Sequence, residues 1–539
     1  MPEVSAKTSA EALDAIVVGA GFSGMYMLHL LRKHGFQSRG IERGDDVGGT
    51  WYWNRYPGCR CDVESMEYSY QFDAELQQRW NWSERYAPQA EILQYANHVA
   101  DTFDLRELIS FETSVTAAHY DAAQQRWQVQ TDRGETLSTQ FLIMATGCLS
   151  AANTPDFPGL ADFAGETYHT GQWPKDGVDF TGQRVAVIGT GSSAIQSIPL
   201  IAQQARELTV FQRTANYSVP ARNQPLDPSY ERQIKANYED FRLRNKQQMP
   251  AFGANYPRRT DSVLEATAEQ REARFEEYWQ HGGFMFGGAF GDLGLSLEGN
   301  AHVAEFVRNK IRSMVSDAET AELLCPTTVF GCKRLCADTG YYETYNLPHV
   351  HLVDVSERPI EALTADGLVA DGKSYEFDSI VFATGFDAMT GSLLRCDIRG
   401  SERQKLGDKW SAGPRTYLGL MMHGFPNLFT MTGPGSPSVL ANMITGGEQH
   451  AEFITACLDW CRKEGHRTIE AQLDAENEWV EVVNMRAAQT LYPRCNSWYL
   501  GANVPGKPRV FMPYLGFPDY AEKLQAVVAD DYQGFATSG

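Results

Sequence analysis

Two glycine-rich turns, each directly after an apolar run typical of a buried strand, limit most strongly how this chain can fold. The first turn is residues 19–24 (GAGFSG), after the run 15–18 (AIVV); the second is residues 189–194 (GTGSSA), after the run 185–188 (VAVI). A helical pattern follows each turn. Small residues there let backbone N–H groups approach a pyrophosphate, whose charge lies at the positive end of the following helix. The sequence therefore predicts two strand–turn–helix units that bind dinucleotides, in an α/β chain.

The residue that follows the second strand of each unit differs in charge. Glu42 lies 18 residues after Gly24, and Arg213 lies 19 residues after Ala194. A carboxylate at this place can accept hydrogen bonds from ribose hydroxyls, whereas a guanidinium suits a 2′-phosphate. We therefore expect the first unit to bind FAD and the second to bind NADPH, in preference to NADH. Within the turns themselves, the residues expected to contact the cofactors are Gly19, Gly21, Phe22, Gly24, Gly189, Gly191, Ser192 and Ser193.

Length and composition narrow the class of protein further. At 539 residues the chain predicts three or four domains or lobes, since a domain averages roughly 150 residues. The net charge of −21 argues against a nucleic-acid partner. No apolar run is long enough to cross a bilayer, and residues 1–5 (MPEVS) lack the basic and apolar regions of a signal peptide. We expect a cytoplasmic protein without membrane insertion.

The ten cysteines form no CxxC pair. Two CxxxC spacings, Cys332/Cys336 and Cys457/Cys461, lack the histidine or cysteine partners of a zinc site. Reduced thiols, as in the cytosol, are therefore expected, and no metal site is predicted.

Two further apolar runs end in Ala-Thr-Gly, at residues 141–147 (FLIMATG) and 380–385 (IVFATG). Such an ending lets the backbone pass close to a bound dinucleotide, so each run is expected to close one unit. After residue 385 the chain should return to the first unit, because the remaining residues carry no nucleotide motif. The predicted fold is α/β, with two Rossmann-like dinucleotide-binding domains and a helical insertion. The predicted boundaries are 1–148 and 385–539 for the FAD-binding domain, 149–225 and 331–384 for the NADPH-binding domain, and 226–330 for the insertion.

Helical patterns in the insertion cover residues 229–245, 266–280 and 301–315. Between the last two lies a glycine-punctuated apolar loop, residues 282–288 (GGFMFGG), which either lines a pocket or fills a core. One helical face of the third pattern carries the apolar residues Val303, Phe306, Val307, Ile311 and Met314.

Two segments between the glycine turns carry other candidate residues. Residues 48–62 (GGTWYWNRYPGCRCD) follow Glu42 closely and should lie beside the flavin, where their aromatic rings could exclude water. Asp62 could place a charge near the chemistry, or cap a turn. In residues 163–174 (FAGETYHTGQWP), His169 could act as a general base. We favour a structural role, in which it tethers the linker between the two domains.

These two segments resemble the signatures of the Baeyer–Villiger monooxygenases. The first matches in GGxWx4YPGx3D and the second, the linker motif, in FxGx3Hx3WP, carried by Phe163, Gly165, His169 and Trp173. The resemblance extends from Asp14 to Phe535. It includes the sequences CKR at 332–334, GPGSPS at 433–438 and SWYLGANVPGK at 497–507.

The resemblance implies a reaction. In such enzymes NADPH reduces FAD, O2 adds at the flavin C4a carbon, and the deprotonated peroxide attacks a ketone. A Criegee adduct then rearranges to an ester or lactone. The implied catalytic residues are Arg334, which would stabilise the anionic peroxide, and Asp62, which would hold and temper that arginine. Arg213, Thr214 and Lys333 would bind the 2′-phosphate, and Trp498 would close a mobile loop over the nicotinamide. Cofactor contacts are also implied for Gly49, Thr50, Trp51, Asp62, Arg334 and Asp387.

Three other functions stay open at this point. A flavin monooxygenase that oxidises nitrogen or sulfur uses a similar layout, but needs a protonated peroxide, beside which an arginine is less useful. A disulfide reductase needs a redox cysteine pair, for which Cys59 and Cys61 are the candidates, although cysteines so close in sequence pair poorly. A redox sensor would use flavin reduction as a conformational signal.

The expected small-molecule partners are O2 and a ketone. Residues 435–443 (GSPSVLANM) resemble enzymes that oxidise arylketones and steroids, whereas residues 284–286 (FMF) and 336–342 (CADTGYY) resemble the cyclohexanone type. The mixture predicts a pocket for cyclic ketones, including bulky ones, with Met443 and Phe286 in its walls.

Overall fold

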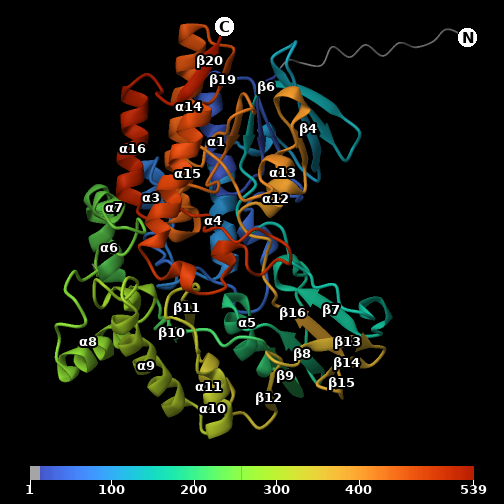
Figure 1. Cartoon of the computed structure of the whole chain (residues 1–539), viewed down its shortest axis with the longest axis vertical. Coiled ribbons are helices and arrows are strands. Elements are labelled where there is room, and N and C mark those ends of the chain that lie inside the picture. The colour runs from blue at the N-terminus through green and yellow to red at the C-terminus, as the bar shows by residue number, and fades with distance from the viewer. Residues whose placement is uncertain (1–12, 257) are drawn as a thin grey trace, which may run out of the picture.

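The computed structural model describes residues 13–256 and 258–539. The expectation about residues 1–5 and the start of the predicted first domain lie outside these residues. Two sheets, each holding one glycine turn, occupy the upper and lower parts of the molecule in Figure 1. No helix in the described ranges has the length and apolar character needed to span a membrane.

The larger sheet has eight strands and holds the first glycine turn. Across it the order is β17 (Asp397–Arg399), β4 (Val115–Asp121), β5 (Arg126–Thr131), β6 (Thr136–Met144), β1 (Leu13–Val18), β2 (Ser38–Ile41) and β3 (Ile109–Ser110), with β18 (Leu428–Thr430) beside β6. β1 runs parallel to β2 and β6, whereas β5 is antiparallel to both of its neighbours. β17 pairs with β4 and β18 with β6, so the chain beyond residue 385 returns to this sheet.

The smaller main sheet has five strands, all parallel, and holds the second glycine turn. Its order is β12 (Val350–Asp354), β9 (Glu207–Gln212), β8 (Arg184–Ile188), β16 (Ser379–Phe382) and β7 (Glu166–His169). A three-stranded antiparallel sheet joins β12 to β16. It consists of β13 (Ile360–Thr364), β14 (Gly367–Ala370) and β15 (Lys373–Glu376). Two strand pairs complete the set: β10 (Ser218–Pro220) with β11 (Cys336–Asp338), and β19 (Thr468–Ala471) with β20 (Phe535–Ser538).

The two glycine turns have the same backbone geometry. Gly19 has φ 107° and Gly189 has φ 114°, in the region that favours glycine. A Cβ on Gly19 would lie 2.5 Å from the carbonyl oxygen of Ala145, and one on Gly189 would lie 2.5 Å from that of Ala383. Each turn therefore packs against the Ala-Thr-Gly ending of its own sheet, and a side chain at either glycine would separate them.

Helices cover both sheets. The helices in the same half of the molecule as the larger sheet are α1 (Phe22–Lys33), α2 (Thr50–Trp53), α3 (Ala74–Arg79), α4 (Gln89–Thr102), α12 (Gly391–Leu394), α13 (Leu406–Lys409), α14 (Met443–Glu464), α15 (Leu473–Ala488) and α16 (Phe517–Ala529). α5 (Ser192–Ala202) follows the second turn, and α11 (Tyr341–Thr344) packs against it. α14 packs along α1 so closely that a Cβ on Gly447 would lie 2.5 Å from Ser23 Oγ. The last part of the chain thus covers the first turn.

The insertion is helical, at the predicted places. It consists of α6 (Pro228–Ala236), α7 (Tyr238–Lys246), α8 (Ala268–His281), the short 3-10 helix η4 (Phe284–Gly288), α9 (Leu297–Met314) and α10 (Ala318–Leu324). One detail was wrong: the single helix expected over 229–245 is broken at Asn237, whose backbone leaves the helical region and whose side-chain Nδ2 donates to the Gln233 carbonyl. On α9, Val303, Phe306, Val307 and Ile311 are buried.

The expectation of ten reduced thiols was wrong for two of them. Cys332 and Cys495, which lie 163 positions apart in the sequence, form a disulfide with their Cα atoms 6.1 Å apart. Spacing gave no sign of this pair, because only the fold brings the two segments together. The other eight cysteines, including Cys59 and Cys61, are buried free thiols.

Candidate active site

The first glycine turn is built to receive a dinucleotide. Glu42 is 6% exposed; its Oε2 accepts from the N–H of Ala20 and its Oε1 from the N–H of Gly44, both at 2.8 Å. A carboxylate has about four acceptor positions, so two remain for ribose hydroxyls. A Cβ on Gly49 would lie 2.8 Å from Gly21 Cα, so the GGTW segment that begins α2 packs directly on this turn. The residues therefore fit the FAD that the sequence predicts.

The second turn faces a pair of cations. Arg213 is exposed directly after β9, and Lys333 is half-buried on the turn before β11. Burial lowers the pKa of Lys333, and the neighbouring Arg213 lowers it further, which places the two charges close together. In residues 13–256 and 258–539 neither side chain has a carboxylate within ion-pair distance. Thr190 Oγ1 donates to the Thr214 carbonyl at 2.8 Å and fixes this segment to the glycine turn. Two unneutralised cations here suit a phosphate group.

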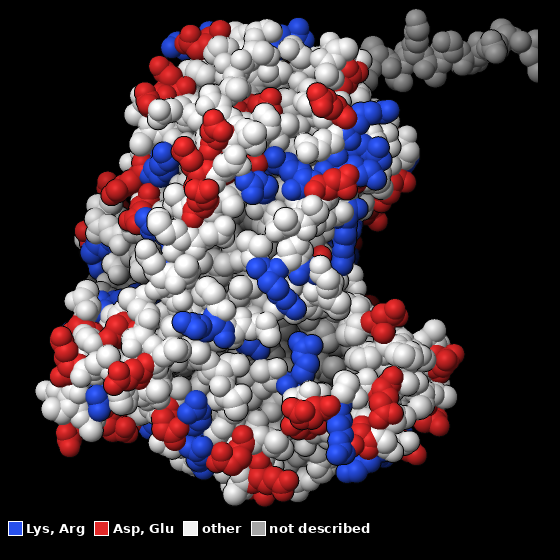
Figure 2. Space-filling view, viewed as in Figure 1, with Lys and Arg blue, Asp and Glu red and all other residues white. Residues whose placement is uncertain are grey.

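Basic side chains gather on the face of the molecule that Figure 2 shows. Figure 2 shows a hollow between the upper and lower halves, with Lys and Arg side chains around it. The chain as a whole carries −21, so basic groups around a hollow mark a local site that favours anions.

Arg334 and Asp62 meet between the two sheets. Arg334 Nε donates to Asp62 Oδ2 at 3.1 Å, and Nη2 donates to Oδ1 at 2.9 Å and Oδ2 at 2.8 Å. Nη1 donates to the Val439 carbonyl at 3.0 Å, and the guanidinium lies over the Phe284 ring at 4.8 Å. Burial alone would lower the pKa of Arg334, but Asp62 and Tyr499 outweigh it and the pKa is raised. The arginine is therefore charged at any working pH, and its plane is fixed.

Hydrogen bonds hold the segment around Trp498 to residues 386–388, directly after the apolar run 380–385. Lys507 Nζ donates to Asp387 Oδ1 at 2.5 Å and to the Ala388 carbonyl at 2.7 Å. Asn503 Nδ2 donates to the Phe386 carbonyl at 2.7 Å. Trp498 begins the short 3-10 helix η8 (Trp498–Leu500), where its ring centroid lies 4.2 Å from that of Tyr499. Asp387 thus holds the Lys507 end of this segment.

The linker motif holds the edge of the five-stranded sheet. His169 is 6% exposed, and its Nδ1 accepts from the N–H of Gly171 at 3.0 Å. Burial lowers the pKa of His169, so the ring is neutral. Phe163 and Trp173 are buried, and a Cβ on Gly165 would lie 2.5 Å from the Asp378 carbonyl oxygen. This geometry supports the structural role that we favour for His169.

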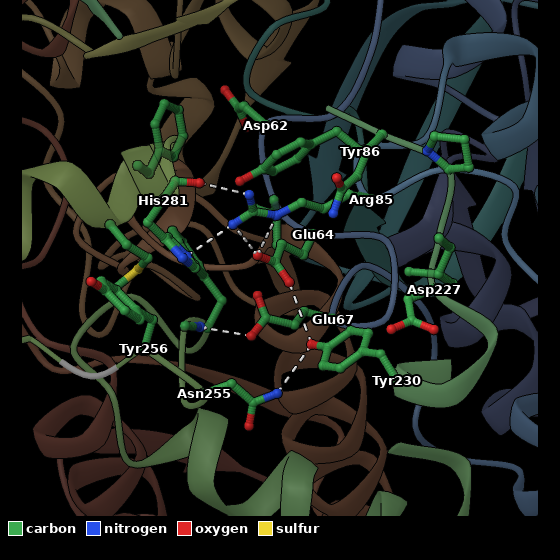
Figure 3. A pocket seen from close by; sticks show the side chains of 18 residues that line it. Asp62, Glu64, Glu67, Arg85, Tyr86, Asp227, Tyr230, Asn255, Tyr256 and His281 are labelled. Atoms are coloured by element: carbon green, nitrogen blue, oxygen red, sulfur yellow. Dashed lines mark hydrogen bonds and ion pairs between the residues drawn. The ribbon is translucent and has the colours of Figure 1, made fainter. Parts of the chain in front are cut away.

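A cavity of about 360 Å³ adjoins the Arg334–Asp62 pair (Figure 3). Asp62 and Phe284, which hold Arg334, also line the cavity. On the side of the insertion, apolar residues alternate with polar ones such as Asp227, Asn255 and His281, whereas residues 64–86 contribute mainly charged side chains. The lining residues are Asp62, Val63, Glu64, Glu67, Arg85, Tyr86, Gln224, Pro225, Leu226, Asp227, Tyr230, Phe252, Gly253, Asn255, Tyr256, His281, Phe284 and Met285.

Sequence reasoning missed the charged wall of this cavity. Arg85 Nε donates to Glu64 Oε1 at 2.8 Å, and its Nη1 donates to the His281 carbonyl at 2.8 Å. Tyr230 donates to Glu64 Oε2 at 3.4 Å and accepts from Asn255 Nδ2 at 3.0 Å (Figure 3). These residues come from segments up to 217 residues apart, Glu64 and His281 included. No local spacing could have pointed to them.

Neither of the two residues predicted for the pocket wall lines this cavity. Phe286 has 0% exposure, and its ring packs against Phe275, Trp279, Phe306 and Phe330, in the core of the insertion. The neighbouring Phe284 and Met285 reach the cavity instead. Met443, the first residue of α14, is half-buried in an apolar cluster with Val439 and Trp498 and is not part of the cavity wall.

We predict that Glu67 makes the stability of the protein depend on pH. It is 3% exposed and accepts from the N–H of Gly253 at 2.8 Å; burial and the nearby Glu64 raise its pKa to about 8 from an ordinary value of 4.5. Between these values the folded state holds the extra proton, so the free energy of unfolding falls as pH rises, by about 1.4 kcal/mol per pH unit. Glu67→Gln should remove this fall.

The check is the melting temperature at pH 5, 6, 7 and 8. Relative to the wild type, Glu67→Gln should gain stability steadily with pH, while the exposed Glu272→Gln should follow the wild type. Parallel curves for all three proteins would show that Glu67 is already ionised in the folded state.

Known proteins agree with this geometry. Residues 16–257 match the family described as pyridine nucleotide-disulphide oxidoreductase. A Baeyer–Villiger monooxygenase of Pseudooceanicola batsensis is 41% identical, over 98% of this chain and 96% of its own. Among solved structures, an oxidized steroid monooxygenase bound to NADP is 50% identical, with a TM-score of 0.92 over 98% of this chain and 99% of that one. The OTEMO complex with FAD and NADP is 41% identical, with a TM-score of 0.94 over 98% and 100%.

The relative and the two solved structures each match over nearly the whole chain; both structures hold NADP, and the OTEMO complex holds FAD as well. Cys59 and Cys61, the candidate redox pair of a disulfide reductase, are buried free thiols and form no disulfide with each other in the described residues. The chain belongs to the Baeyer–Villiger monooxygenase family, whose members use FAD, NADPH and O2 to convert ketones to esters or lactones.

Proposed function

We propose that this enzyme oxidises cyclic ketones, bulky polycyclic ones included, beside the Arg334–Asp62 pair. The observation that carries the proposal is the bidentate pair at the edge of a 360 Å³ cavity. Cavities of about 300–1,000 Å³ accept drug-sized ligands. A relative with the steroid monooxygenase name, at 50% identity, supports the bulky end of this range.

Arg334 is the proposed catalytic residue. FAD, when bound, supplies the activated oxygen. Beside it, Arg334 provides a permanent positive charge that stabilises negative charge on the reacting oxygen atoms. Asp62 engages Nε and Nη2 and so fixes the orientation of the guanidinium, while the Val439 carbonyl holds Nη1. Phe284 covers one face of the guanidinium and keeps water from it.

The cofactor contacts follow from the two turns. The first turn, with Glu42 and the segment that begins at Gly49, would hold the pyrophosphate and ribose of FAD. Arg213 and Lys333 would bind the 2′-phosphate of NADPH, with Thr214 between them and the second turn. Trp498 would lie over the nicotinamide. The other proposed contacts are Gly19, Gly21, Phe22, Gly24, Thr50, Trp51, Gly189, Gly191, Ser192, Ser193 and Asp387.

The proposed domains keep the boundaries expected from sequence. Return of β17 and β18 to the larger sheet supports an FAD-binding domain made of 1–148 and 385–539. Pairing of β16 between β7 and β8 supports an NADPH-binding domain of 149–225 and 331–384, interrupted by the insertion at 226–330. We also propose a cytoplasmic location, which the eight free thiols support. Cell fractionation would test it.

Turnover with ketones of increasing size tests the function. The holoenzyme, NADPH and ¹⁸O2 would be combined with cyclohexanone, phenylacetone, cyclopentadecanone or a steroid ketone. We expect a product one labelled oxygen heavier than the ketone, with the highest kcat/KM for a bulky substrate. The proposal would be contradicted if NADPH oxidation gave only hydrogen peroxide and if none of the ketones changed its rate. A thioether in the same series would show whether sulfur is the preferred target.

A further inference from the structure

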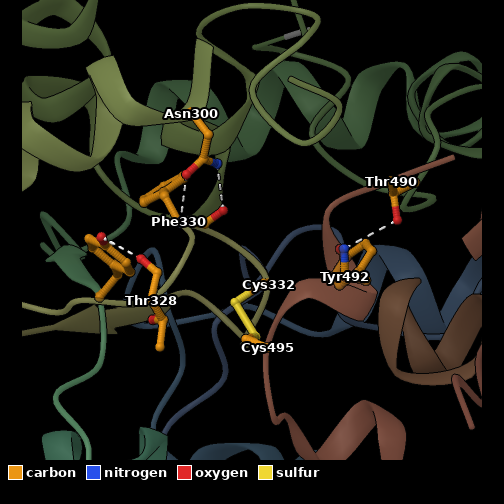
Figure 4. The surroundings of a disulfide bond; sticks show 8 residues. Asn300, Thr328, Phe330, Cys332, Thr490, Tyr492 and Cys495 are labelled. Atoms are coloured by element: carbon orange, nitrogen blue, oxygen red, sulfur yellow. Dashed lines mark hydrogen bonds between the residues drawn. A yellow bond between two sulfur atoms is a disulfide. The ribbon is translucent and has the colours of Figure 1, made fainter. Parts of the chain in front are cut away.

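The disulfide joins two segments that both carry residues of the proposed site (Figure 4). Cys332 directly precedes Lys333 and Arg334, and Cys495 lies three residues before Trp498. The bond therefore connects the turn that presents Arg334 to the segment that presents Trp498.

Both segments that the disulfide links lack regular secondary structure near the bond. Up to residue 330 the first segment is held to its surroundings, because the Phe330 N–H donates to Asn300 Oδ1 at 2.8 Å and Asn300 Nδ2 donates back to the Phe330 carbonyl at 2.9 Å (Figure 4). From 331 to 335 the chain has no helix or strand. The second segment, between α15 and α16, contains only short 3-10 turns, η7 (Tyr492–Arg494) and η8. Segments without regular hydrogen bonding open easily, so a covalent link has a large effect on them.

The two sulfur atoms differ in access. Cys332 is 1% exposed, whereas Cys495 is half-buried between exposed residues, Arg494 and Asn496. In the reduced protein a small oxidant would therefore reach Cys495 first, and Cys332 would follow as the resolving thiol.

We propose that Cys332 and Cys495 are a reversible oxidation site, whose disulfide holds the Trp498 segment against the Arg334 turn and whose reduction loosens the NADP-binding side. The proposal rests on the function proposed above. The oxidant is a hydroperoxide, hydrogen peroxide above all, the product that a flavin monooxygenase releases when it consumes NADPH without substrate.

The reaction balances as follows. The Cys495 thiolate attacks one peroxide oxygen, which breaks the O–O bond and gives a sulfenic acid and water. The Cys332 thiol then attacks that sulfur, forms the S–S bond and expels the hydroxyl as a second water. Two thiols and one hydrogen peroxide give one disulfide and two waters; a dithiol reductant reverses the change by thiol–disulfide exchange.

Retention of NADP⁺ should change with the redox state. If the reduced segment lies in the binding-competent position for one-tenth of the time, the apparent affinity falls about tenfold. Reduced enzyme should then also lose more NADPH to peroxide formation, because Trp498 leaves the site open to water.

The experiment compares two preparations of the holoenzyme, one reduced with dithiothreitol and desalted, the other then treated with hydrogen peroxide. Alkylation and peptide mass spectrometry should find a linked 332–495 pair only after peroxide. Titration with NADP⁺ should give about tenfold weaker binding by the reduced form. Cys495→Ser should bind like the reduced form and ignore peroxide. Cys396→Ser, which removes a buried free thiol of another part of the fold, should respond like the wild type.

Two results would overturn the proposal. One is alkylation of both cysteines after peroxide; the other is equal NADP⁺ affinity in the two forms. Cys332→Ser provides a second variant if Cys495→Ser fails to fold. Ester formation is measured separately in both forms, so absence of any ester would refute the proposed function and leave the thiol and NADP⁺ results to stand alone.

Discussion

Arg334→Ala should lose nearly all ester formation, although NADPH should still bleach its flavin. Flavin reduction needs only a bound nicotinamide near the ring, whereas oxygenation needs the guanidinium charge. Removal of one group that stabilises developing negative charge costs about 10²–10³ in rate, and here the group is a full charge in a water-poor site. We therefore expect ester formation to fall by at least about 10³-fold.

Two rates separate these steps. Anaerobic stopped-flow absorbance measures flavin reduction, and gas chromatography of aerobic mixtures measures ester. Arg308→Ala is a matched control, because Arg308 also forms a carboxylate pair and its side chain is 26% exposed, against 25% for Arg334, but it lies on α9. The control should keep both rates near those of the wild type.

A second substitution tests whether Arg334 needs its bidentate contact with Asp62 as well as its charge. Arg334→Lys keeps a charge but loses the bidentate geometry that binds Nε and Nη2 to Asp62, so we expect partial activity. Ester formation by Arg334→Ala at a near-normal rate would remove Arg334 from the reaction, whatever the flavin did.

Local patterns predicted the parts of the fold that depend on local chemistry. Gly19 and Gly189 must be glycine because a Cβ at either position would lie 2.5 Å from a carbonyl oxygen, and the glycine-rich pattern of each turn reflects this constraint. The carbonyl groups concerned belong to the two Ala-Thr-Gly endings, at Ala145 and Ala383. Arg334 is different: its residue type alone indicated a surface ion pair, and only the family resemblance singled it out.

Features that depend on distant contacts were missed. The cavity wall brings Glu64 and Arg85 to His281 of the insertion, and the disulfide brings Cys332 to Cys495. Neither pairing has a fixed spacing along the chain. Phe286 was misplaced for a related reason. The two rings of the GGFMFGG loop, Phe284 and Phe286, are equally apolar. Only the packing of helices α8 and α9 decides which of them is buried.

Arg213→Ala should weaken NADPH far more than NADH. A hydrogen bond between charged groups contributes about 1.5–3 kcal/mol, so KM for NADPH should rise about ten- to hundredfold. NADH lacks the 2′-phosphate, and its KM should stay within about twofold, the range of a surface substitution. Steady-state oxidation of each cofactor with a saturating ketone measures both values. Arg358→Ala, an exposed arginine beside the same sheet, is the control and should change neither.

The second cation makes this test more stringent. Burial and then Arg213 lower the pKa of Lys333, which indicates that the two cations lie close together; with Arg213 removed, the charge of Lys333 can still attract the phosphate and compensate in part. The double variant Arg213→Ala with Lys333→Ala should therefore lose more NADPH affinity than the two single variants predict, because neither can then replace the other. Added salt should weaken NADPH binding to the wild type and hardly affect the double variant. Equal losses for NADPH and NADH would instead place the 2′-phosphate away from both side chains, and the charge at residue 213 would no longer explain the choice of cofactor.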